Sequence, residues 1–463
     1  MSAEATRSAD TAAYRTGLQG RSFSRALLRH TLSHKTRVIT LVFATAAGFF
    51  ATSSPVSAKD DFGYPIADPF LATIAGTPSD LQKKFPRELE LTTAHLPKLA
   101  NREVPKALWY QQRLQYSWAM QDKPAPLIFT LAGTGGYHNS DTNTQLMEAF
   151  FNAGYHVVGL TSPSHPEFIV SQSTTAVPGH VKSDAEDVYS VMEQIVERLK
   201  MKRLITGYAL AGYSLGGTHS AFIAKLDQER KRFNFEKVLL LNPSVSLYNS
   251  ISILDRMLQN IPGGVDNLNS FFAEVISRVG SLYNRSTTVE FNSDTVLLAF
   301  QADPPSDEEL VAIIGTAFRL SAANLIFTAD VMNDFGFIKP SRQTLKRQTD
   351  RDHYLEVALR VGFTDYFHDF LWPYYEDSFE GDRQQFAAEQ SLVYLKDFLA
   401  SADNIAVVTN VDEIILAAGE IDFLEETFGD RAFIYPRGGH LGNLAFGQTQ
   451  DDYIGFLTDG AKQ

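Results

Sequence analysis

LITGYALAGYSLGG, residues 204–217, joins an apolar run to a turn rich in glycine. Residues 204–211 predict a buried strand, because a short apolar run that ends at glycine is typical of one. A helix is predicted directly after the turn, to about Lys225. Between strand and helix stands a Gly-x-Ser-x-Gly pentapeptide with Ser214 at its centre. A serine in so tight a turn is held above the sheet on a strained backbone, which makes Ser214 a candidate nucleophile.

Strands and helices alternate on both sides of this turn. Further strands are predicted at 127–132, 155–161, 238–241, 405–409 and 432–435, and helices at 142–152 and 182–199. The second of these helices has apolar residues at helical spacing. Strands that alternate with helices of this length predict an α/β fold with a mostly parallel central sheet, covered by helices on both faces.

The alternation stops at Asn242 and resumes only at Ile405. The chain between these points predicts a helical insertion, residues 248–403, between two late strands. Its helical segments are expected at 271–282, 308–327, 354–361 and 384–398. The densest aromatic cluster of the chain, residues 366–375, lies within the insertion. These rings predict either the core of the insertion or a wall for an apolar substrate.

The first 58 residues have the three parts of a secretory signal peptide. Residues 1–37 carry seven basic side chains against two acidic ones, and the uncharged, mostly apolar run 38–52 follows. That run is shorter than the ~20 residues that a membrane-spanning helix needs. Small residues at 56 and 58 suit a signal peptidase. We therefore expect cleavage after Ala58 and export to a bacterial periplasm or the medium; a buried N-terminal helix or an uncleaved membrane anchor is the alternative.

Composition excludes several classes of protein. The chain has 463 residues, of which 44% are hydrophobic and 21% charged, as in folded globular proteins. It has no cysteine, which excludes a disulfide scaffold, a cysteine nucleophile and zinc sites built from cysteine. The formal net charge of -13 argues against nucleic-acid binding, because nucleic-acid binders gather Lys and Arg to contact phosphates. Chemistry must then come from serine, histidine and carboxylates.

The residues around Ser214 resemble the α/β-hydrolase family of serine hydrolases, which includes esterases and lipases. The resemblance covers the chain from about residue 127 to its end, apart from the insertion. Members carry a nucleophile, an acid and a histidine in that order along the chain. The resemblance implies Ser214 as nucleophile, Asp412 after the strand 405–409 as acid, and His440 within Gly-Gly-His-Leu-Gly as base. Residues 59–247 and 404–463 would form the hydrolase core, and residues 248–403 a cap.

Alternatives for the acid and the base remain in the sequence. Glu413 is adjacent to Asp412, and Asp403 and Asp422 are near it. The histidines that compete with His440 outside the leader include His138, His165, His219, His353 and His368. Replacements at the two neighbouring carboxylates would decide the acid.

Two backbone N–H groups are implied for the oxyanion hole, which binds the negative oxygen of the reaction intermediate. One belongs to Leu215, the residue after the nucleophile. The other is expected from Thr134, in the glycine-rich turn that follows the strand 127–132. Gly135 remains an alternative, because Ala132-Gly133 stands where family members often have His-Gly.

The function implied by the resemblance is esterase or lipase-like cleavage of a carboxylic ester through an acyl-enzyme on Ser214. No metal and no nucleotide cofactor is expected, since the sequence has no motif for either. The same triad serves peptidases, amidases and acyltransferases, so these activities stay open. A non-catalytic binding protein on the same scaffold is a further alternative. The expected partner is a small-molecule or lipid-like ester, with transient contact between the cap and a membrane surface left open.

Overall fold

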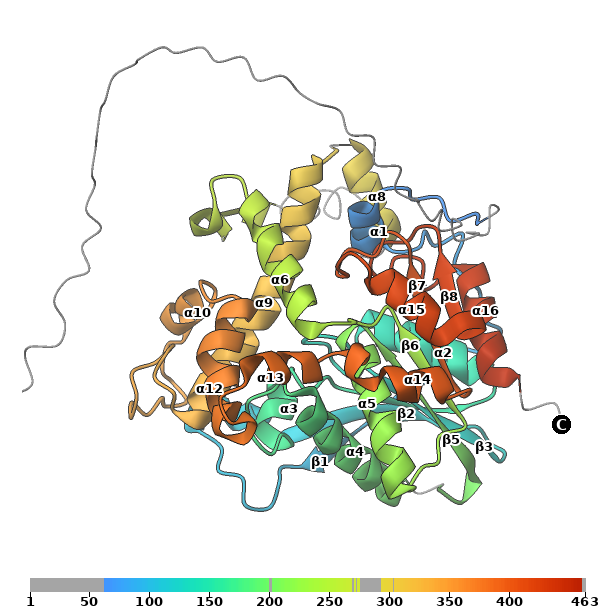
Figure 1. Cartoon of the computed structure of the whole chain (residues 1–463), viewed down its shortest axis with the longest axis horizontal. Coiled ribbons are helices and arrows are strands. Elements are labelled where there is room, and N and C mark those ends of the chain that lie inside the picture. Colours follow the sequence, from blue (N-terminus) through green and yellow to red (C-terminus); the bar gives the residue numbers. More distant parts are fainter. Residues whose placement is uncertain are drawn as a thin grey trace, which may run out of the picture. The chain divides into compact units, whose positions relative to one another are not determined.

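A single mixed sheet organises the chain in the computed structural model, which describes residues 62–199, 202–268, 270–271, 273–274, 293–302 and 304–459. Its strands are β1 (Thr92–Pro97), β2 (Arg113–Ala119), β3 (Ala125–Leu131), β4 (His156–Leu160), β5 (Ile205–Tyr213), β6 (Lys237–Leu241), β7 (Ile405–Asn410) and β8 (Ala432–Tyr435). Their order across the sheet is β1-β2-β4-β3-β5-β6-β7-β8. Within these described residues, β2 is antiparallel to both of its neighbours, β1 and β4, and the other pairs of neighbouring strands are parallel. The predicted mostly parallel sheet is therefore confirmed (Figure 1).

Helices cover both faces of this sheet. Those outside the insertion are α1 (Pro69–Ala75), η1 (Lys106–Gln111), α2 (Asp141–Asn152), α3 (Pro166–Ser171), α4 (Val181–Arg198), η2 (Lys202–Leu204), α5 (Leu215–Arg230), α15 (Glu420–Phe428), η8 (Gly429–Arg431) and α16 (Gly447–Thr458). Successive side chains of a strand point to opposite faces. In β6, Val238 and Leu240 pack with α4 and α5, whereas Leu239 and Leu241 pack with α2 and α16. Burial on both faces explains why the parallel strands are continuous apolar runs.

The antiparallel edge of the sheet was not anticipated from the sequence. β1 and β2 pair along their whole length, from Thr92 opposite Trp118 to Pro97 opposite Arg113. Their residues alternate between polar and apolar because the edge is partly exposed, so they lack the long apolar run that marks the central strands.

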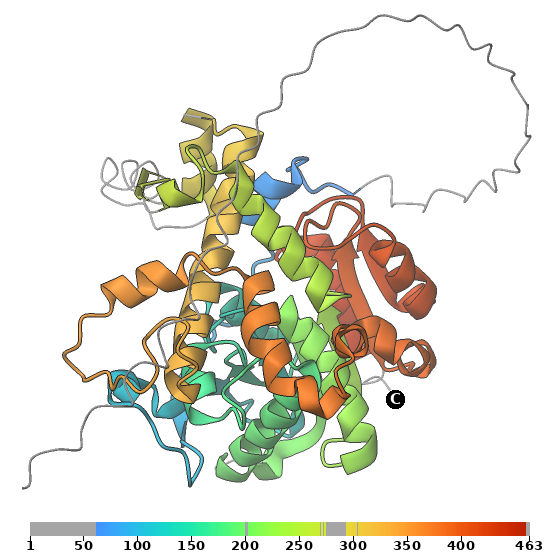
Figure 2. The ribbon, with the colours of Figure 1, turned by 60° about the vertical axis from the view of Figure 1, so that its left-hand side comes forward.

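The chain between β6 and β7 is largely helical where the structure describes it. Its helices are α6 (Leu247–Met257), η3 (Leu258–Asn260), η4 (Val265–Asn267), α8 (Ser293–Ala302), α9 (Asp307–Asn333), α10 (Asp352–Ala358), α11 (Phe363–Tyr366), the π-helix η5 (Phe367–Leu371), α12 (Trp372–Tyr375), η6 (Glu376–Phe379), α13 (Arg383–Glu389), η7 (Leu392–Leu395) and α14 (Lys396–Ser401). α6 and α9 lie side by side (Figures 1 and 2). The aromatic rings of 366–375 belong to the same buried cluster as side chains of α9. Most of the predicted segment 271–282 and the predicted leader, residues 1–58, lie outside the described residues.

Hydrogen bonds close the base of the insertion earlier than the predicted limit of residue 403. The Leu392 N–H donates to Val245 O at 2.8 Å, and the Leu247 N–H donates to Gln390 O at 3.1 Å. Beyond this neck, Leu395 and Leu399 pack with the sheet core rather than with the insertion. The amphipathic pattern of 384–398 continues through the neck, so the pattern alone does not mark it. We use the name cap for residues 247–390.

The longest helix of the cap, α9, is long and apolar enough to cross a membrane by length and composition, with a mean hydropathy of 1.8. In the structure 61% of its most apolar window is buried, and it contacts α6, α10 and α3. Burial inside the protein accounts for its apolar composition, as in the core helix of a soluble domain.

Candidate active site

Ser214 occupies the turn between β5 and α5. Its backbone angles are φ 54° and ψ -127°, a region that residues with a side chain rarely adopt. The Ser214 N–H donates to Leu241 O at 2.8 Å, which holds the turn against the carboxyl end of the neighbouring strand β6. The first turn of α5 starts at Leu215, so its free N–H groups and its positive dipole end lie next to the serine. The predicted turn is confirmed, and its strain is of the kind that gathers at functional sites.

Close backbone contacts explain the glycines on either side of Ser214. A Cβ at Gly212 would lie 2.1 Å from Gly216 O, and a Cβ at Gly216 would lie 2.2 Å from Leu131 O. Both distances are shorter than any van der Waals contact, and the clashing atoms belong to the backbone. The two glycines therefore allow β5, α5 and the end of β3 to meet at the nucleophile.

Gly212→Ala is expected to lower the free energy of unfolding by about 2–4 kcal/mol, because the new methyl group must displace backbone. Urea denaturation would measure the change. Gly455→Ala is the matched control: no atom lies within 4 Å of a Cβ built there, and Gly455 is inside α16. It should stabilise the protein by about 0.5–1 kcal/mol. Equal stability of the two variants would contradict the close packing at the turn.

The glycine-rich turn after β3, residues 133–136, packs directly against the nucleophile. A Cβ at Gly133 would lie 3.0 Å from Ser214 Cβ. The Gly135 N–H donates to Ser164 Oγ at 2.8 Å, so it is engaged in holding the turn. Thr134, Ser214 and Leu215 line the same cavity. Of the two candidates left open by the sequence, Thr134 is the one that lines this cavity, and the hydrogen bonds of the described residues leave its N–H without an acceptor.

His440 is paired with Glu413. The contact between His440 Nδ1 and Glu413 Oε1 is 2.9 Å, and both side chains are buried. The other carboxylate oxygen, Glu413 Oε2, accepts a hydrogen bond from Asn242 Nδ2 at 2.6 Å. The backbone N–H of His440 donates to Thr73 Oγ1 on α1 at 2.8 Å. Four segments far apart in the sequence therefore fix the position of one imidazole ring.

The predicted pairing of His440 with Asp412 is wrong. The Asp412 carboxylate accepts the backbone N–H groups of Gly438 at 3.2 Å and Gly439 at 2.9 Å. Burial raises the pKa of Asp412 above its ordinary value, and the two N–H donors oppose that effect. Asp412 comes directly after the end of β7 and is turned toward the loop 437–443, whereas Glu413 points at the ring. Asp412 thus holds the histidine loop, and the adjacent carboxylate contacts the histidine.

A functional residue that the sequence interpretation missed is Asn242. It follows β6 directly, adopts φ 43°, and connects Glu413 to the strand whose Leu241 O accepts the Ser214 N–H. The signal available in the sequence is a polar residue at the carboxyl end of a central strand, which is where open α/β sheets place their sites.

The structure brings Ser214, Thr134 and Leu215 to one cavity and joins His440 to Glu413, but it records no hydrogen bond between Ser214 and His440. His440 Nε2 is buried and has no hydrogen-bond partner in the described part of the chain. It is therefore available to accept a proton. Hydrogen bonds between catalytic groups are often long before substrate binds and tighten in the complex.

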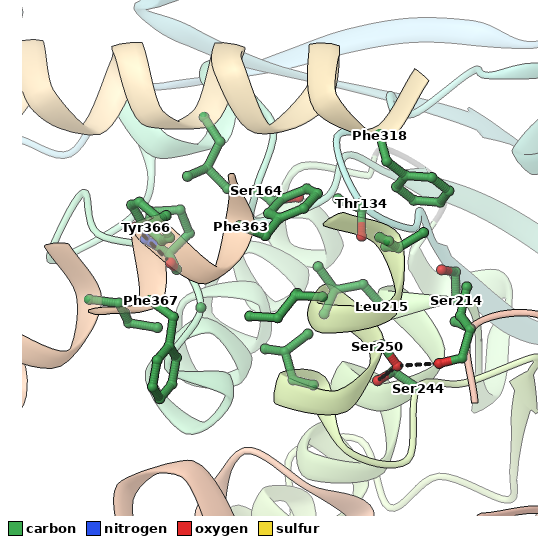
Figure 3. Close-up of a pocket in the computed structure, with 18 of the residues that line it drawn as sticks. Thr134, Ser164, Ser214, Leu215, Ser244, Ser250, Phe318, Phe363, Tyr366 and Phe367 are labelled. Carbon is green, nitrogen blue, oxygen red and sulfur yellow. Dashed lines mark hydrogen bonds between the residues drawn. The ribbon is translucent and has the colours of Figure 1, made fainter. Parts of the chain in front are cut away.

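The cavity extends from Ser214 beneath the cap (Figure 3). The cap contributes mostly apolar side chains to its lining, from α6, α9, α11 and η5, including Leu254, Phe318, Phe363 and Phe367. The core contributes the rest of the lining. Part of the aromatic cluster thus forms a cavity wall, and the rest packs within the cap. Among the residues described, no group of three or more histidines, aspartates and glutamates is placed to hold a metal ion.

Two of the competing histidines lie behind the glycine-rich turn rather than in the cavity lining. His138 Nδ1 is 2.7 Å from Ser117 Oγ, and His165 Nδ1 accepts the Glu167 N–H at 3.2 Å. Burial lowers the pKa of each to about 4, and for His165 the nearby His138 contributes as well. These histidines are neutral members of the protein interior.

A pH dependence of stability follows from these pKa values. An unfolded histidine binds a proton below about pH 6.5, whereas the folded His138 binds one only near pH 4. Between these values the unfolded state holds more protons, so stability falls as the pH is lowered from about 6.5 to 4. His138→Asn should reduce this loss, measured as the urea midpoint between pH 4 and 7. Identical pH slopes for the variant and the wild type would show that His138 contributes nothing.

The order of the site residues along the chain agrees with the order expected from the resemblance to α/β-hydrolases. Ser214 stands in a strained turn between strand and helix, a carboxylate follows β7, and the histidine that it contacts follows β8, which matches the expected order of nucleophile, acid and histidine. The chain has the α/β-hydrolase fold. The fold carries a cap between β6 and β7, and the carboxylate in contact with His440 is a glutamate where an aspartate was expected.

Solved structures similar to this α/β-hydrolase chain are hydrolases of several kinds. A putative hydrolase from Legionella pneumophila is 12% identical with a TM-score of 0.43, over 85% of this chain and 95% of that one. A membrane phospholipase A, described as a bacterial virulence factor, is 14% identical with a TM-score of 0.40, over 81% and 87%. An esterase from Pyrococcus furiosus is 9% identical with a TM-score of 0.38, over 83% and 95%. No protein-family model and no curated protein matches the sequence.

Proposed function

We propose that the protein is a serine hydrolase that cleaves carboxylic esters through an acyl-enzyme on Ser214. The observation that carries the proposal is the strained serine beside Thr134 and Leu215 at the mouth of a mostly apolar cavity. A substrate carbonyl in the cavity could reach this serine, and we propose the backbone N–H groups of Thr134 and Leu215 as the oxyanion donors. A buried His–Glu pair supplies the base.

In the proposed reaction, His440 Nε2 takes the proton of the Ser214 hydroxyl while the serine oxygen forms a bond to the ester carbonyl carbon. The N–H groups of Thr134 and Leu215 stabilise the negative oxygen of the tetrahedral intermediate. His440 then gives its proton to the leaving alcohol as the ester C–O bond breaks. A water molecule, deprotonated by the same nitrogen, releases the acid and restores Ser214.

Glu413 acts through the histidine. Its carboxylate holds Nδ1–H, which leaves Nε2 as the proton acceptor, and it stabilises the imidazolium that forms. Asn242 orients Glu413 by occupying its second oxygen. Asp412 positions the loop that carries His440, and it is a positioning residue rather than a catalytic one.

The substrate we propose is an ester with an apolar acyl group, which the aromatic and aliphatic lining of the cavity would select. Export remains part of the proposal and rests on the sequence of residues 1–58. We also propose that the cap makes transient contact with a membrane surface.

The test is hydrolysis of a series of p-nitrophenyl esters from acetate to palmitate, with matched p-nitroanilides. We expect turnover of the esters with an optimum at an intermediate chain length, because side chains of the cap line the cavity and limit its room. Faster turnover of the anilides would instead assign a peptidase or amidase. Absence of turnover of every ester and anilide by folded protein would favour the non-catalytic alternative.

A further inference from the structure

The cavity that starts at Ser214 has a carboxylate at its other end. Tyr366 and Ser214 lie at opposite ends of the side chains that line the cavity (Figure 3). The Tyr366 hydroxyl donates to Pro178 O at 2.9 Å, and the adjacent Gly179 N–H donates to Asp184 Oδ2 at 2.7 Å. Asp184 is itself a lining residue and is 3% exposed. The distal wall of a mostly apolar cavity is therefore acidic.

One oxygen of the Asp184 carboxylate accepts no hydrogen bond from the described residues. The hydrogen bonds of the described residues occupy Asp184 Oδ2 but leave Oδ1 without a donor. A carboxylate oxygen at a cavity surface that has no donor from the protein can accept a hydrogen bond from a bound molecule. Because Asp184 lines the cavity, a donor for Oδ1 can come from a molecule bound there.

A second buried polar group lies behind Asp184. His219 Nε2 is 3.5 Å from Asp184 Oδ2, and neither ring nitrogen has a hydrogen-bond partner in the described residues. The His219 side chain is almost completely buried. Two neighbouring polar side chains, both short of partners at the end of an apolar cavity, are the pattern of a site built for a polar ligand group.

Asp187, on the same helix as Asp184, is a buried carboxylate with a purely structural role. Asp187 Oδ2 accepts both the N–H of Thr174, at 2.8 Å, and its hydroxyl, at 3.2 Å. It is buried one turn from Asp184, but it is not among the cavity-lining residues. Like Asp184, Asp187 has hydrogen-bond donors on one oxygen only, so the two carboxylates differ in that Asp184 alone lines the cavity.

The position of this end of the cavity sets the reach of a ligand. His219 is five residues beyond Ser214 in the chain, and an α-helix rises 1.5 Å per residue, so the two are separated by roughly 7.5 Å along α5. This rise measures the separation of the two backbones, and an acyl chain of roughly six carbons, with C–C bonds of ~1.5 Å, is of similar length. His440, which must protonate the leaving alcohol, is not among the lining residues, so the cavity holds the acyl side of the ester.

We propose that Asp184, supported by His219, accepts a hydrogen bond from a hydroxyl group near the end of a medium-length acyl chain bound in the cavity. This inference rests on the proposed ester hydrolysis at Ser214 and names its substrate class as ω-hydroxyacyl esters. A hydroxyl group fits because it can donate to Oδ1, to which no described residue donates, and because the many apolar side chains of the lining accommodate a hydrocarbon chain.

The test compares kcat/KM for p-nitrophenyl 6-hydroxyhexanoate with kcat/KM for p-nitrophenyl hexanoate. We expect the wild-type protein to prefer the hydroxylated ester by about tenfold, the scale of a hydrogen bond to a charged acceptor. Asp184→Asn should reduce the preference to less than about twofold: its amide oxygen can still accept the Gly179 N–H, but its NH2 group donates where Oδ1 accepted. Asp187→Asn, the matched control, should keep the preference.

The outcomes separate this inference from the proposed function. Hydrolysis of the hexanoate without a preference for the hydroxylated ester would overturn the distal site and leave the esterase proposal standing. A preference that survives Asp184→Asn would also overturn it. Faster turnover of the 6-aminohexanoate than of the 6-hydroxyhexanoate would replace the hydroxyl group by a cation and overturn the class named here. No turnover of either ester would count against the esterase proposal itself.

Discussion

Ser214→Ala is expected to lower kcat toward p-nitrophenyl esters by roughly 10⁴ to 10⁶. The variant keeps the cavity and the oxyanion donors but has no oxygen with which to form the acyl-enzyme. Because alanine is smaller than serine and Ser214 N–H bonds to Leu241 through the backbone, the fold should survive the change. Steady-state kinetics and thermal unfolding of the purified variant measure the two effects.

Ser220→Ala is the matched control. Ser220 is a buried serine on the same helix, whose hydroxyl donates to Gly216 O at 2.8 Å. Its loss should cost about 1 kcal/mol of stability and change kcat by less than about tenfold. The residues of a triad act as a unit. The kcat of the double variant Ser214→Ala with His440→Ala should therefore be only slightly lower than the kcat of Ser214→Ala alone. A further large loss in the double variant would contradict a shared role.

Glu413→Gln is expected to lower kcat by roughly 10³ to 10⁴, with little change in KM. Glutamine can accept a hydrogen bond from Nδ1–H, but it has no charge to stabilise the imidazolium, and its NH2 group favours the wrong tautomer of His440. The effect lies on the chemical step rather than on substrate binding. The measurement is kcat and KM on the ester that the wild type cleaves best.

Asp412→Asn is the comparison that discriminates the two adjacent carboxylates. Its amide oxygen can still accept one of the N–H groups of Gly438 and Gly439, so we expect a loss of about tenfold or less in kcat, together with a lower midpoint of thermal unfolding. A larger loss of kcat at Asp412 than at Glu413 would restore the acid expected from the sequence and refute the pairing in the structure.

The parts of the fold that could be predicted are those with a strong local signature. The central strands are apolar because they are buried on both faces, and the turn at Ser214 is marked by glycines that the backbone contacts require. The edge strands β1 and β2 carry no such signature. The end of the cap could not be located either, because the hydrogen bonds between Val245 and Leu392 join residues 147 positions apart.

The acid was assigned incorrectly for a reason of geometry. Asp412 and Glu413 are adjacent and both follow β7, so the order of residues along the chain fits either. What separates them is the direction of each side chain after the strand ends at Asn410. Only the positions of Asn242 and His440, supplied by two other strands, show that Glu413 is the partner.

Labelling with a fluorophosphonate probe tests the central claim most directly. We predict that one probe molecule attaches to the wild-type protein at Ser214, located by mass spectrometry of its peptides, and that His440→Ala and Glu413→Gln slow the labelling. Labelling at another residue, or none at all in protein shown to be folded, would contradict a nucleophile at Ser214.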